Sequence, residues 1–171
     1  MAALAGYRWY LFGAQAVMVW GRPRLTADLD VTVAVDPADA GSFITRLQAF
    51  GFSVRLEDPA DFILRTRVIP LVHSGSGLPV DVILAGPGLE EQFLERAILV
   101  SIGEVDVPVI SPEDLIIAKI LAGRPKDIED VRGVIAERAS ELDFERILLL
   151  LGMLEDALSR NDLVSELQRL R

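Results

Sequence analysis

The chain has 171 residues, of which 51% are hydrophobic, and a formal net charge of −9 at pH 7. This length predicts one domain of ordinary size with a helical appendage, and the apolar content supplies a full core. The absence of cysteine excludes disulfides and thiolate metal sites.

The excess of acidic residues lies in the second part of the chain. Residues 1–75 carry seven arginines and seven acids, whereas residues 76–171 carry the whole excess. Binding of a long nucleic acid needs clustered lysine and arginine, so this balance argues against an extended RNA or DNA substrate. The apolar N-terminus is interrupted by Arg8 and has no basic segment before it, which predicts neither a signal peptide nor a membrane span. We therefore expect a soluble, cytoplasmic protein with no membrane partner.

Residues 8–33 form the most informative stretch. A strand-like run at 8–12 precedes Gly13 and a helical run, and a second strand begins with two aspartates. Side chains alternate along a strand, so Asp28 and Asp30 point to the same side. Carboxylates so close together repel each other unless a cation compensates them, and hard oxygen ligands suit Mg²⁺ or Mn²⁺. Backbone N–H groups at the helix start attract an anion. The alternative is a pair of solvated aspartates at a strand entrance.

This order of glycine, short helix, glycine and Arg-x-Thr-x-Asp-x-Asp resembles the minimal nucleotidyltransferase fold shared with DNA polymerase beta. The closest likeness is to the bacterial branch of abortive-infection and toxin nucleotidyltransferases. The resemblance implies an α/β fold with a mixed, twisted sheet flanked by helices and followed by a helical C-terminal region. It also implies that Asp28 and Asp30 hold the metal. The residues it assigns to the nucleotide are Gly13, Ala14, Arg24 and Thr26. Many members have Gly-Gly or Gly-Ser where this chain has Gly13-Ala14, which leaves the phosphate contact to backbone N–H groups.

The elements that follow alternate between helices and strands. Apolar spacing predicts a helix at 37–50 with Asp36 as its cap, a strand at 52–56, and a short helix or irregular turn at 58–67. Two further strands, at 68–73 and 78–84, are joined by a polar, glycine-rich turn.

Asp81 lies within the second of these strands, among aliphatic residues. A charge in such a run is costly unless it is paired or bound to a metal. The resembled fold brings a third carboxylate from a neighbouring strand to face the Asp-x-Asp pair, and Asp81 is the position that fits. Its implied role is to bind the catalytic metal and to help deprotonate the attacking hydroxyl. The alternative is an aspartate at the exposed edge of a hairpin.

A second block follows a predicted helix at 89–97 and a hairpin at 98–110. Ser111 and Pro112 start a helix that runs to 122, and the next helix begins after residues 123–127. This block resembles the same branch, which implies that Lys119 and Lys126 hold triphosphate oxygens with Arg124 as a planar partner. Asp127 would cap the second helix and orient one of these bases, as would Asp130. The alternative is a capped helix–turn–helix with surface salt bridges.

The tail from 139 to 171 has leucine stripes at helical spacing. These stripes pack on their own domain, on a second copy of the chain as a homodimer, or on a partner protein, and all three remain open here. We place the boundary near Ile110, with a nucleotidyltransferase-like core at 1–110 and a helical region at 111–171.

The implied reaction is metal-dependent transfer of a nucleoside monophosphate from a nucleoside triphosphate to a hydroxyl, with pyrophosphate leaving. The acceptor in the resembled branch is a tRNA end, a protein or a small molecule, and a toxin–antitoxin role goes with that branch. Two alternatives remain. Ala14 favours a non-catalytic binding or regulatory module, and the leucine-rich tail is compatible with a purely structural helical partner.

Overall fold

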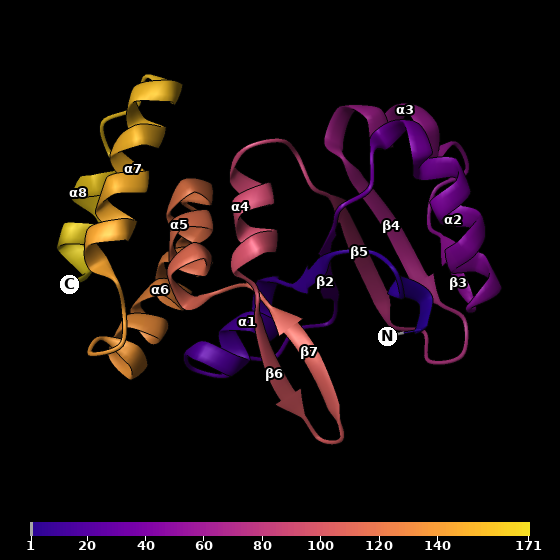
Figure 1. Cartoon of the computed structure of the whole chain (residues 1–171), viewed down its shortest axis with the longest axis horizontal. Coiled ribbons are helices and arrows are strands. Elements are labelled where there is room, and N and C mark those ends of the chain that lie inside the picture. The colour runs from indigo at the N-terminus through magenta and orange to yellow at the C-terminus, as the bar shows by residue number, and fades with distance from the viewer. Residues whose placement is uncertain (1) are drawn as a thin grey trace. The chain divides into compact units, whose positions relative to one another are not determined.

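The structure is a computed structural model, and it describes residues 2–171. The chain divides into two compact units. The first unit comprises the residues up to Gln15 together with Leu25–Ile110, and the second comprises Ala16–Arg24 together with Ser111–Arg171. Helix α1 (Gly13–Trp20) therefore starts in the first unit and ends in the second. Figure 1 labels most of the elements of both.

The first unit is built on a seven-stranded mixed sheet with the order β3-β4-β5-β2-β1-β7-β6. Its strands are β1 (Trp9–Leu11), β2 (Leu29–Val33), β3 (Phe52–Val54), β4 (Val68–His73), β5 (Pro79–Leu84), β6 (Ile98–Ile102) and β7 (Val105–Val109). The pairs β2–β5 and β1–β7 are parallel and the other neighbours are antiparallel. This arrangement confirms the predicted α/β class with a mixed sheet and a helical C-terminal region.

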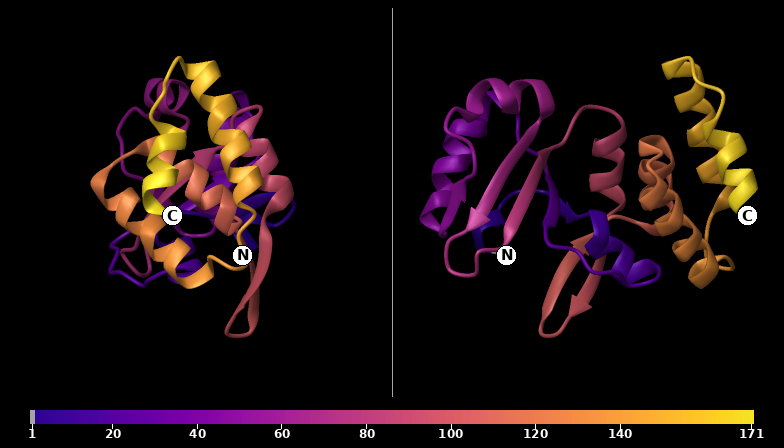
Figure 2. Two further views of the ribbon diagram at one scale, coloured as in Figure 1. Left: turned by 90° about the vertical axis from the view of Figure 1, so that its left-hand side faces the viewer. Right: turned by 180° about the vertical axis from the view of Figure 1, so that it is seen from behind.

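Helices α2 (Ala40–Ala49) and α3 (Pro59–Thr66) lie along β3 and β4, as Figures 1 and 2 both show. Their buried residues Phe43, Leu47 and Ile63 join aliphatic side chains from one face of β4 and β5 in a single core. The remaining helical elements are η1 (Ala2–Leu4), η2 (Pro37–Asp39) and α4 (Leu89–Arg96). Because side chains alternate along a strand, the opposite face of β5 is left for Asp81.

Several helix boundaries follow the local signals. Asp36 accepts a hydrogen bond from the Ala38 N–H at 2.8 Å, and Ser111 accepts one from the Asp114 N–H at 3.1 Å. The helix expected at 37–50 begins as a 3-10 turn before α2. Of the two alternatives for 58–67, the chain adopts the helix, α3.

The second unit contains α5 (Pro112–Ala122), α6 (Pro125–Arg138), α7 (Phe144–Leu158) and α8 (Leu163–Leu170). Helix α5 contacts the other three and is buried along most of its length. The tail divides into two helices because Ser159 ends α7 in the left-handed conformation, with φ 52°. Ile147, Leu151, Leu163 and Leu167 are fully buried, so these stripes pack within the unit. Among the helices of residues 2–171, none is long and apolar enough to cross a membrane.

The end of α1 packs closely on α6 within this second unit. A Cβ atom on Gly21 would lie 2.9 Å from the Val134 nitrogen, and one on Gly133 would lie 3.2 Å from the Arg22 nitrogen. The first distance is shorter than real Cβ atoms show and the second is tighter than most Cβ contacts, so the two glycines allow the backbones to approach each other. This contact places Arg24, a few residues after the end of α1, next to α6.

Candidate functional site

Three aspartates of the first unit converge on one face of its sheet. Each of Asp28, Asp30 and Asp81 offers a carboxylate oxygen, and these oxygens lie within 4.8 Å of one another. The strand register explains the meeting, because Asp30 and Asp81 are direct neighbours on the parallel strands β2 and β5. Asp28 lies two residues before Asp30 and so projects to the same side. All three are half-buried, which leaves them open to a ligand.

The donor set of this cluster fits a hard divalent cation. Mg²⁺ and Mn²⁺ prefer carboxylate oxygens, and two ligands of one Mg²⁺ ion are at most about 4.2 Å apart. The carboxylates therefore need only small side-chain rotations to share an ion. Like charges at this spacing repel one another, so a cation also relieves an unfavourable arrangement. Asp28, Asp30 and Asp81 are the residues that would hold it.

Gly13 forms the opposite wall of the cluster at the start of α1. Its φ is +61°, and a Cβ atom at this position would overlap the Oδ2 atom of Asp30. The Phe12 N–H also donates to the Asp30 carbonyl at 3.0 Å. Glycine is therefore required here for both its backbone conformation and its lack of a side chain. The next residue, Ala14, is buried.

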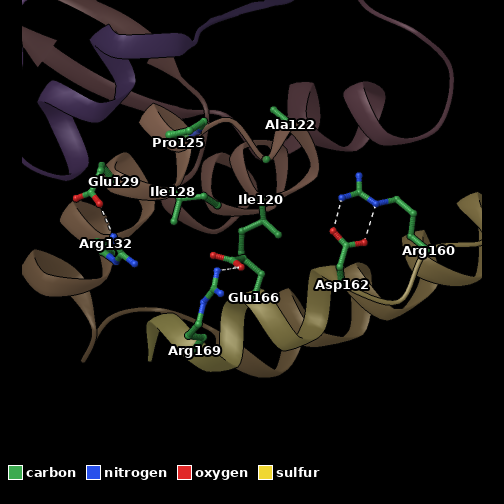
Figure 3. Close-up of a pocket in the computed structure, with 11 residues that line it drawn as sticks. Ile120, Ala122, Pro125, Ile128, Glu129, Arg132, Arg160, Asp162, Glu166 and Arg169 are labelled. Carbon is green, nitrogen blue, oxygen red and sulfur yellow. Dashed lines mark hydrogen bonds and ion pairs between the residues drawn. The ribbon is translucent and has the colours of Figure 1, made fainter.

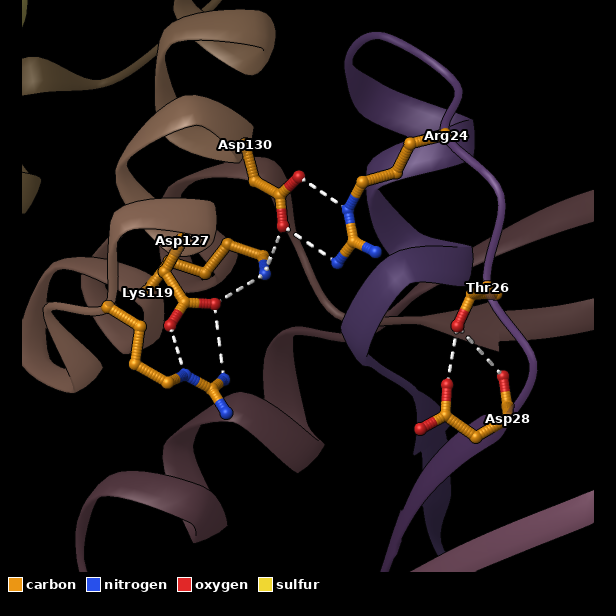
Figure 4. Close-up of polar contacts among 7 residues, drawn as sticks. Arg24, Thr26, Asp28, Lys119, Asp127 and Asp130 are labelled. Atoms are coloured by element: carbon orange, nitrogen blue, oxygen red, sulfur yellow. Dashed lines mark hydrogen bonds and ion pairs between the residues drawn. The ribbon is translucent and has the colours of Figure 1, made fainter.

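Asp28 is held by two polar neighbours from the same unit. The Thr26 hydroxyl donates to the Asp28 carboxylate, as Figure 4 shows. The Gln15 amide donates from Nε2 to the Asp28 carbonyl oxygen at 2.5 Å. Thr26, which the resemblance assigned to the nucleotide, thus also contacts a member of the acidic cluster. Gln15 was not identified from the sequence.

Arg55 is a further residue that the sequence reasoning missed. Its guanidinium forms an ion pair with the Asp81 carboxylate. Its backbone N–H donates to the Pro70 carbonyl at 2.9 Å. In the sheet, Pro70 on β4 is paired with Asp81 on β5, which is paired in turn with Asp30 on β2. Four residues from four strands or strand ends thus lie in one row across the sheet. The arginine places positive charge at the cluster, as a bound cation would.

The second unit contains a separate group of charges, in which Lys119 is central (Figure 4). Its ammonium lies 3.1 Å from Asp127 and 2.7 Å from Asp130, and its residue is only 3% exposed. Arg24 binds Asp130 through two hydrogen bonds of 2.8 and 3.1 Å. Arg124 binds Asp127 in the same two-pronged way. Three bases and two acids therefore form one network, which we call the lysine network.

The two carboxylates of the lysine network are held in the ionised form. Burial by itself would raise the pKa of Asp127, but hydrogen bonds and charges from Arg124 and Lys119 outweigh it and lower the pKa. Burial would also raise the pKa of Asp130, but hydrogen bonds and charges from Arg24 and Lys119 outweigh it and lower the pKa of that carboxyl. Buried charges are tolerated when they are paired in this manner.

The structure places the basic residues of the second block in different environments. Lys119 is buried within the network, whereas Lys126 is exposed and the Arg124 side chain is 61% exposed. The expectation that Asp127 caps the helix is wrong, because α6 begins at Pro125 with Arg124 before it. Proline favours the first helical position, which puts Asp127 inside the first turn. There it does orient bases, as expected.

Two open cavities lie apart from the acidic cluster, one within each unit. The cavity in the second unit has a volume of about 510 Å³, and every acid on its wall is paired with an arginine (Figure 3). These pairs are Glu129–Arg132, Asp162–Arg160 and Glu166–Arg169. The cavity in the first unit, of about 350 Å³, lies beyond the ends of β2 and β5. Neither is lined by the three clustered aspartates.

Comparison with known proteins finds similarity to nucleotidyltransferases. A family model described as "Nucleotidyltransferase of unknown function (DUF6036)" matches residues 4–164. No curated protein sequence matches the chain.

Solved structures share the fold at low sequence identity. The solution structure of the antibiotic-resistance factor ANT(2'')-Ia has a TM-score of 0.61 at 14% identity, covering 92% of this chain and 88% of the other. The crystal structure of ANT(2'')-Ia in complex with adenylyl-2''-tobramycin gives 0.60 at 16% identity, covering 92% and 93%. An antigenic nucleotidyltransferase-like protein from Paracoccidioides brasiliensis gives 0.53 at 21% identity, covering 95% and 84%.

Proposed function

Because the chain belongs to the nucleotidyltransferase family that it matches over residues 4–164, we propose that it transfers a nucleoside monophosphate from a nucleoside triphosphate to a hydroxyl acceptor. The observation that carries this proposal is the meeting of Asp28, Asp30 and Asp81 opposite the glycine that opens α1. A cluster of carboxylates with this donor chemistry suits a divalent metal, and phosphoryl chemistry depends on such ions.

In this proposal the three aspartates have distinct roles. Asp28 and Asp30 hold Mg²⁺ or Mn²⁺, which when bound stabilises negative charge on the attacking and leaving oxygens. Asp81 completes the ligand set and accepts the proton of the acceptor hydroxyl. The hydroxyl oxygen forms a bond to the α-phosphorus, the bond between that phosphorus and the bridging oxygen breaks, and pyrophosphate leaves.

The nucleotide-binding residues follow from the resemblance and from exposure. Backbone N–H groups of Gly13 and Ala14 and the Thr26 hydroxyl would contact phosphate oxygens in the first unit. In the second unit we assign phosphate contacts to Arg24, Arg124 and the exposed Lys126. Two further residues, Lys119 and Asp127, would hold these side chains in place. Both are buried in the lysine network, so their effect on the nucleotide would act through the arginines.

The acceptor that the charge distribution favours is a small, cationic molecule bearing a hydroxyl. The chain has a net charge of −9, which attracts cations and repels the phosphates of a long nucleic acid. The similar protein ANT(2'')-Ia was crystallised with adenylyl-2''-tobramycin, in which the acceptor is of this small-molecule kind. The competing hypotheses are that the acceptor is a tRNA end or a protein, and that the protein acts as a toxin.

A radiolabelled transfer assay tests the proposal. The purified protein is incubated with Mg²⁺, each α-³²P-labelled triphosphate and either an aminoglycoside panel or cell extract that retains RNA and protein. We expect a labelled small molecule that disappears with Asp30→Asn. Label on RNA or protein would support nucleotidyl transfer and overturn the small-molecule acceptor.

Ala14 favours a second candidate function, a non-catalytic nucleotide-binding module, because it stands where many relatives in the resembled branch have glycine or serine. Calorimetry with Mg²⁺ and each triphosphate tests nucleotide binding, which both functions require, and the transfer assay separates the enzyme from the module. Metal-dependent binding that Asp28→Asn and Asp30→Asn abolish, with no transfer to any acceptor, would establish the module and contradict the enzyme.

A further inference from the structure

The side chain of Gln15, on α1, carries a buried amide oxygen. Its Oε1 atom is inaccessible to solvent and has no hydrogen-bond partner among the described residues. The other end of the same amide is engaged, since Nε2 donates to the Asp28 carbonyl at 2.5 Å. This bond fixes the orientation of the amide, because exchanging the two atoms would bring Oε1 against the Asp28 carbonyl oxygen.

An acceptor left in this state is unfavourable. Leaving a buried polar atom without a partner is costly, and the large majority of buried polar atoms in proteins hydrogen-bond to protein groups or to ordered water. The position of Gln15 indicates which kind of ligand. Its amide is bonded to Asp28, and Gly13, two residues earlier on the same helix, lies against the carboxylate of Asp30. Gln15 therefore lies on the helix that borders the acidic cluster and is bonded to the main chain of one member of that cluster.

We infer that Gln15 is an outer-sphere residue of the metal site, whose Oε1 accepts a hydrogen bond from a water molecule bound to the cation. This inference rests on the proposed function. Mg²⁺ usually keeps several waters when it is held by a few carboxylates, and these waters need acceptors. Outer-sphere partners of this type change metal affinity by about 10–100-fold when they are removed. Gln15 would be a positioning residue for the metal and its water.

Binding of Mn²⁺ without nucleotide, followed by electron paramagnetic resonance and calorimetry, tests the inference apart from activity. Gln15→Leu removes the acceptor, so we expect the Mn²⁺ affinity to fall by about 10–100-fold. Gln15→Glu keeps an acceptor oxygen and adds a negative charge, so it should bind Mn²⁺ at least as tightly as the unaltered protein. Gln92→Leu, at an exposed position of α4, is the matched control and should not change the affinity. Urea unfolding shows whether each variant is folded.

The outcomes separate this inference from the proposed function. If Asp30→Asn abolishes Mn²⁺ binding and Gln15→Leu does not weaken it, the outer-sphere role is wrong and the metal site stands. If Gln15→Leu and Gln15→Glu weaken binding equally, the bond from Nε2 to Asp28 is what matters, and the acceptor role is overturned. If Asp30→Asn binds Mn²⁺ as tightly as the unaltered protein, the proposed function itself fails.

Discussion

The two units each gather aspartates, and they treat them in opposite ways. In the first unit three carboxylates meet on a sheet face, half-buried, with Arg55 at one of them. In the second unit two carboxylates are almost completely buried, and Lys119, Arg24 and Arg124 bind them. The chain completes the second cluster with its own bases, whereas the first is arranged so that a cation can complete it. In the proposed function, the same residue type therefore serves chemistry in the first unit and architecture in the second.

The largest expected effect is on activity, in the acidic cluster. Asp30→Asn removes a charged ligand of the metal, so we expect the transfer rate to fall by at least about 10³-fold, or about 4 kcal/mol in activation free energy. The free energy of unfolding in the absence of metal should stay the same or rise, because repulsion between neighbouring carboxylates is relieved. Initial rates and urea unfolding measure the two quantities. A variant that loses stability in proportion to its activity would refute the contrast between the clusters.

The next effect is on stability, in the lysine network. Lys119→Met leaves two buried carboxylates without their shared ammonium, which should lower the free energy of unfolding by about 3–5 kcal/mol. Lys126→Met is the matched control, since this lysine is exposed, and it should change stability by less than about 0.5 kcal/mol. Denaturant unfolding monitored by circular dichroism compares them. Equal stabilities of the two variants would show that the buried network is not structural.

Acid should weaken the same network by a smaller amount. The pKa values of Asp127 and Asp130 are lowered in the folded chain from an ordinary value of 3.8. Their contribution to stability is therefore complete above pH 3.8 and is lost as the pH falls through the lowered values. The loss is smaller than for Lys119→Met because a protonated carboxyl costs less to bury than an unpaired charge. Urea midpoints measured from about pH 5 to about pH 2.5 should fall less steeply in Asp130→Asn than in the unaltered protein.

Gly13→Ala tests the packing of the acidic cluster, and we expect it to lower stability by less than Lys119→Met does. The left-handed conformation of Gly13 penalises alanine by about 1–2 kcal/mol, and the added methyl group must displace the Asp30 carboxylate. Mn²⁺ affinity should fall together with thermal stability. Gly152→Ala, a helical position where a Cβ atom meets nothing, should instead stabilise by about 0.4–1 kcal/mol. Calorimetry gives both quantities, and unchanged metal affinity in Gly13→Ala would remove Gly13 from the site.

The smallest effect concerns Arg55. Its side chain is 40% exposed and pairs with Asp81, so it would compete with a metal ion for that carboxylate. Exposed ion pairs contribute about 0–1 kcal/mol, so Arg55→Gln should raise the Mn²⁺ affinity by no more than about fivefold. A matched change at the exposed Arg65, which pairs with Asp61, should have no effect. Weaker binding in Arg55→Gln would show that the arginine supports the metal site instead of competing with it.

The features that the sequence determined by itself are local ones, namely which residues share a strand face and where a helix begins. The period of a strand put Asp28 and Asp30 on one side, and Ser111 with Pro112 marked the start of α5, because these relations span only a few residues. The fold class followed from the order of such elements and from the resemblance. These features depend on backbone geometry that neighbouring residues impose on each other.

Only the tertiary structure decided which distant residues meet. Asp81 reaches Asp30 through the register of β2 and β5, and Arg55 joins the row from just beyond the end of β3, on the far side of β4. The bond between Arg24 and Asp130 depends in the same way on the close approach of α1 and α6 at Gly21 and Gly133. Register and helix packing are set by side chains that fill a common core, and a single chain read in order contains no direct record of those contacts.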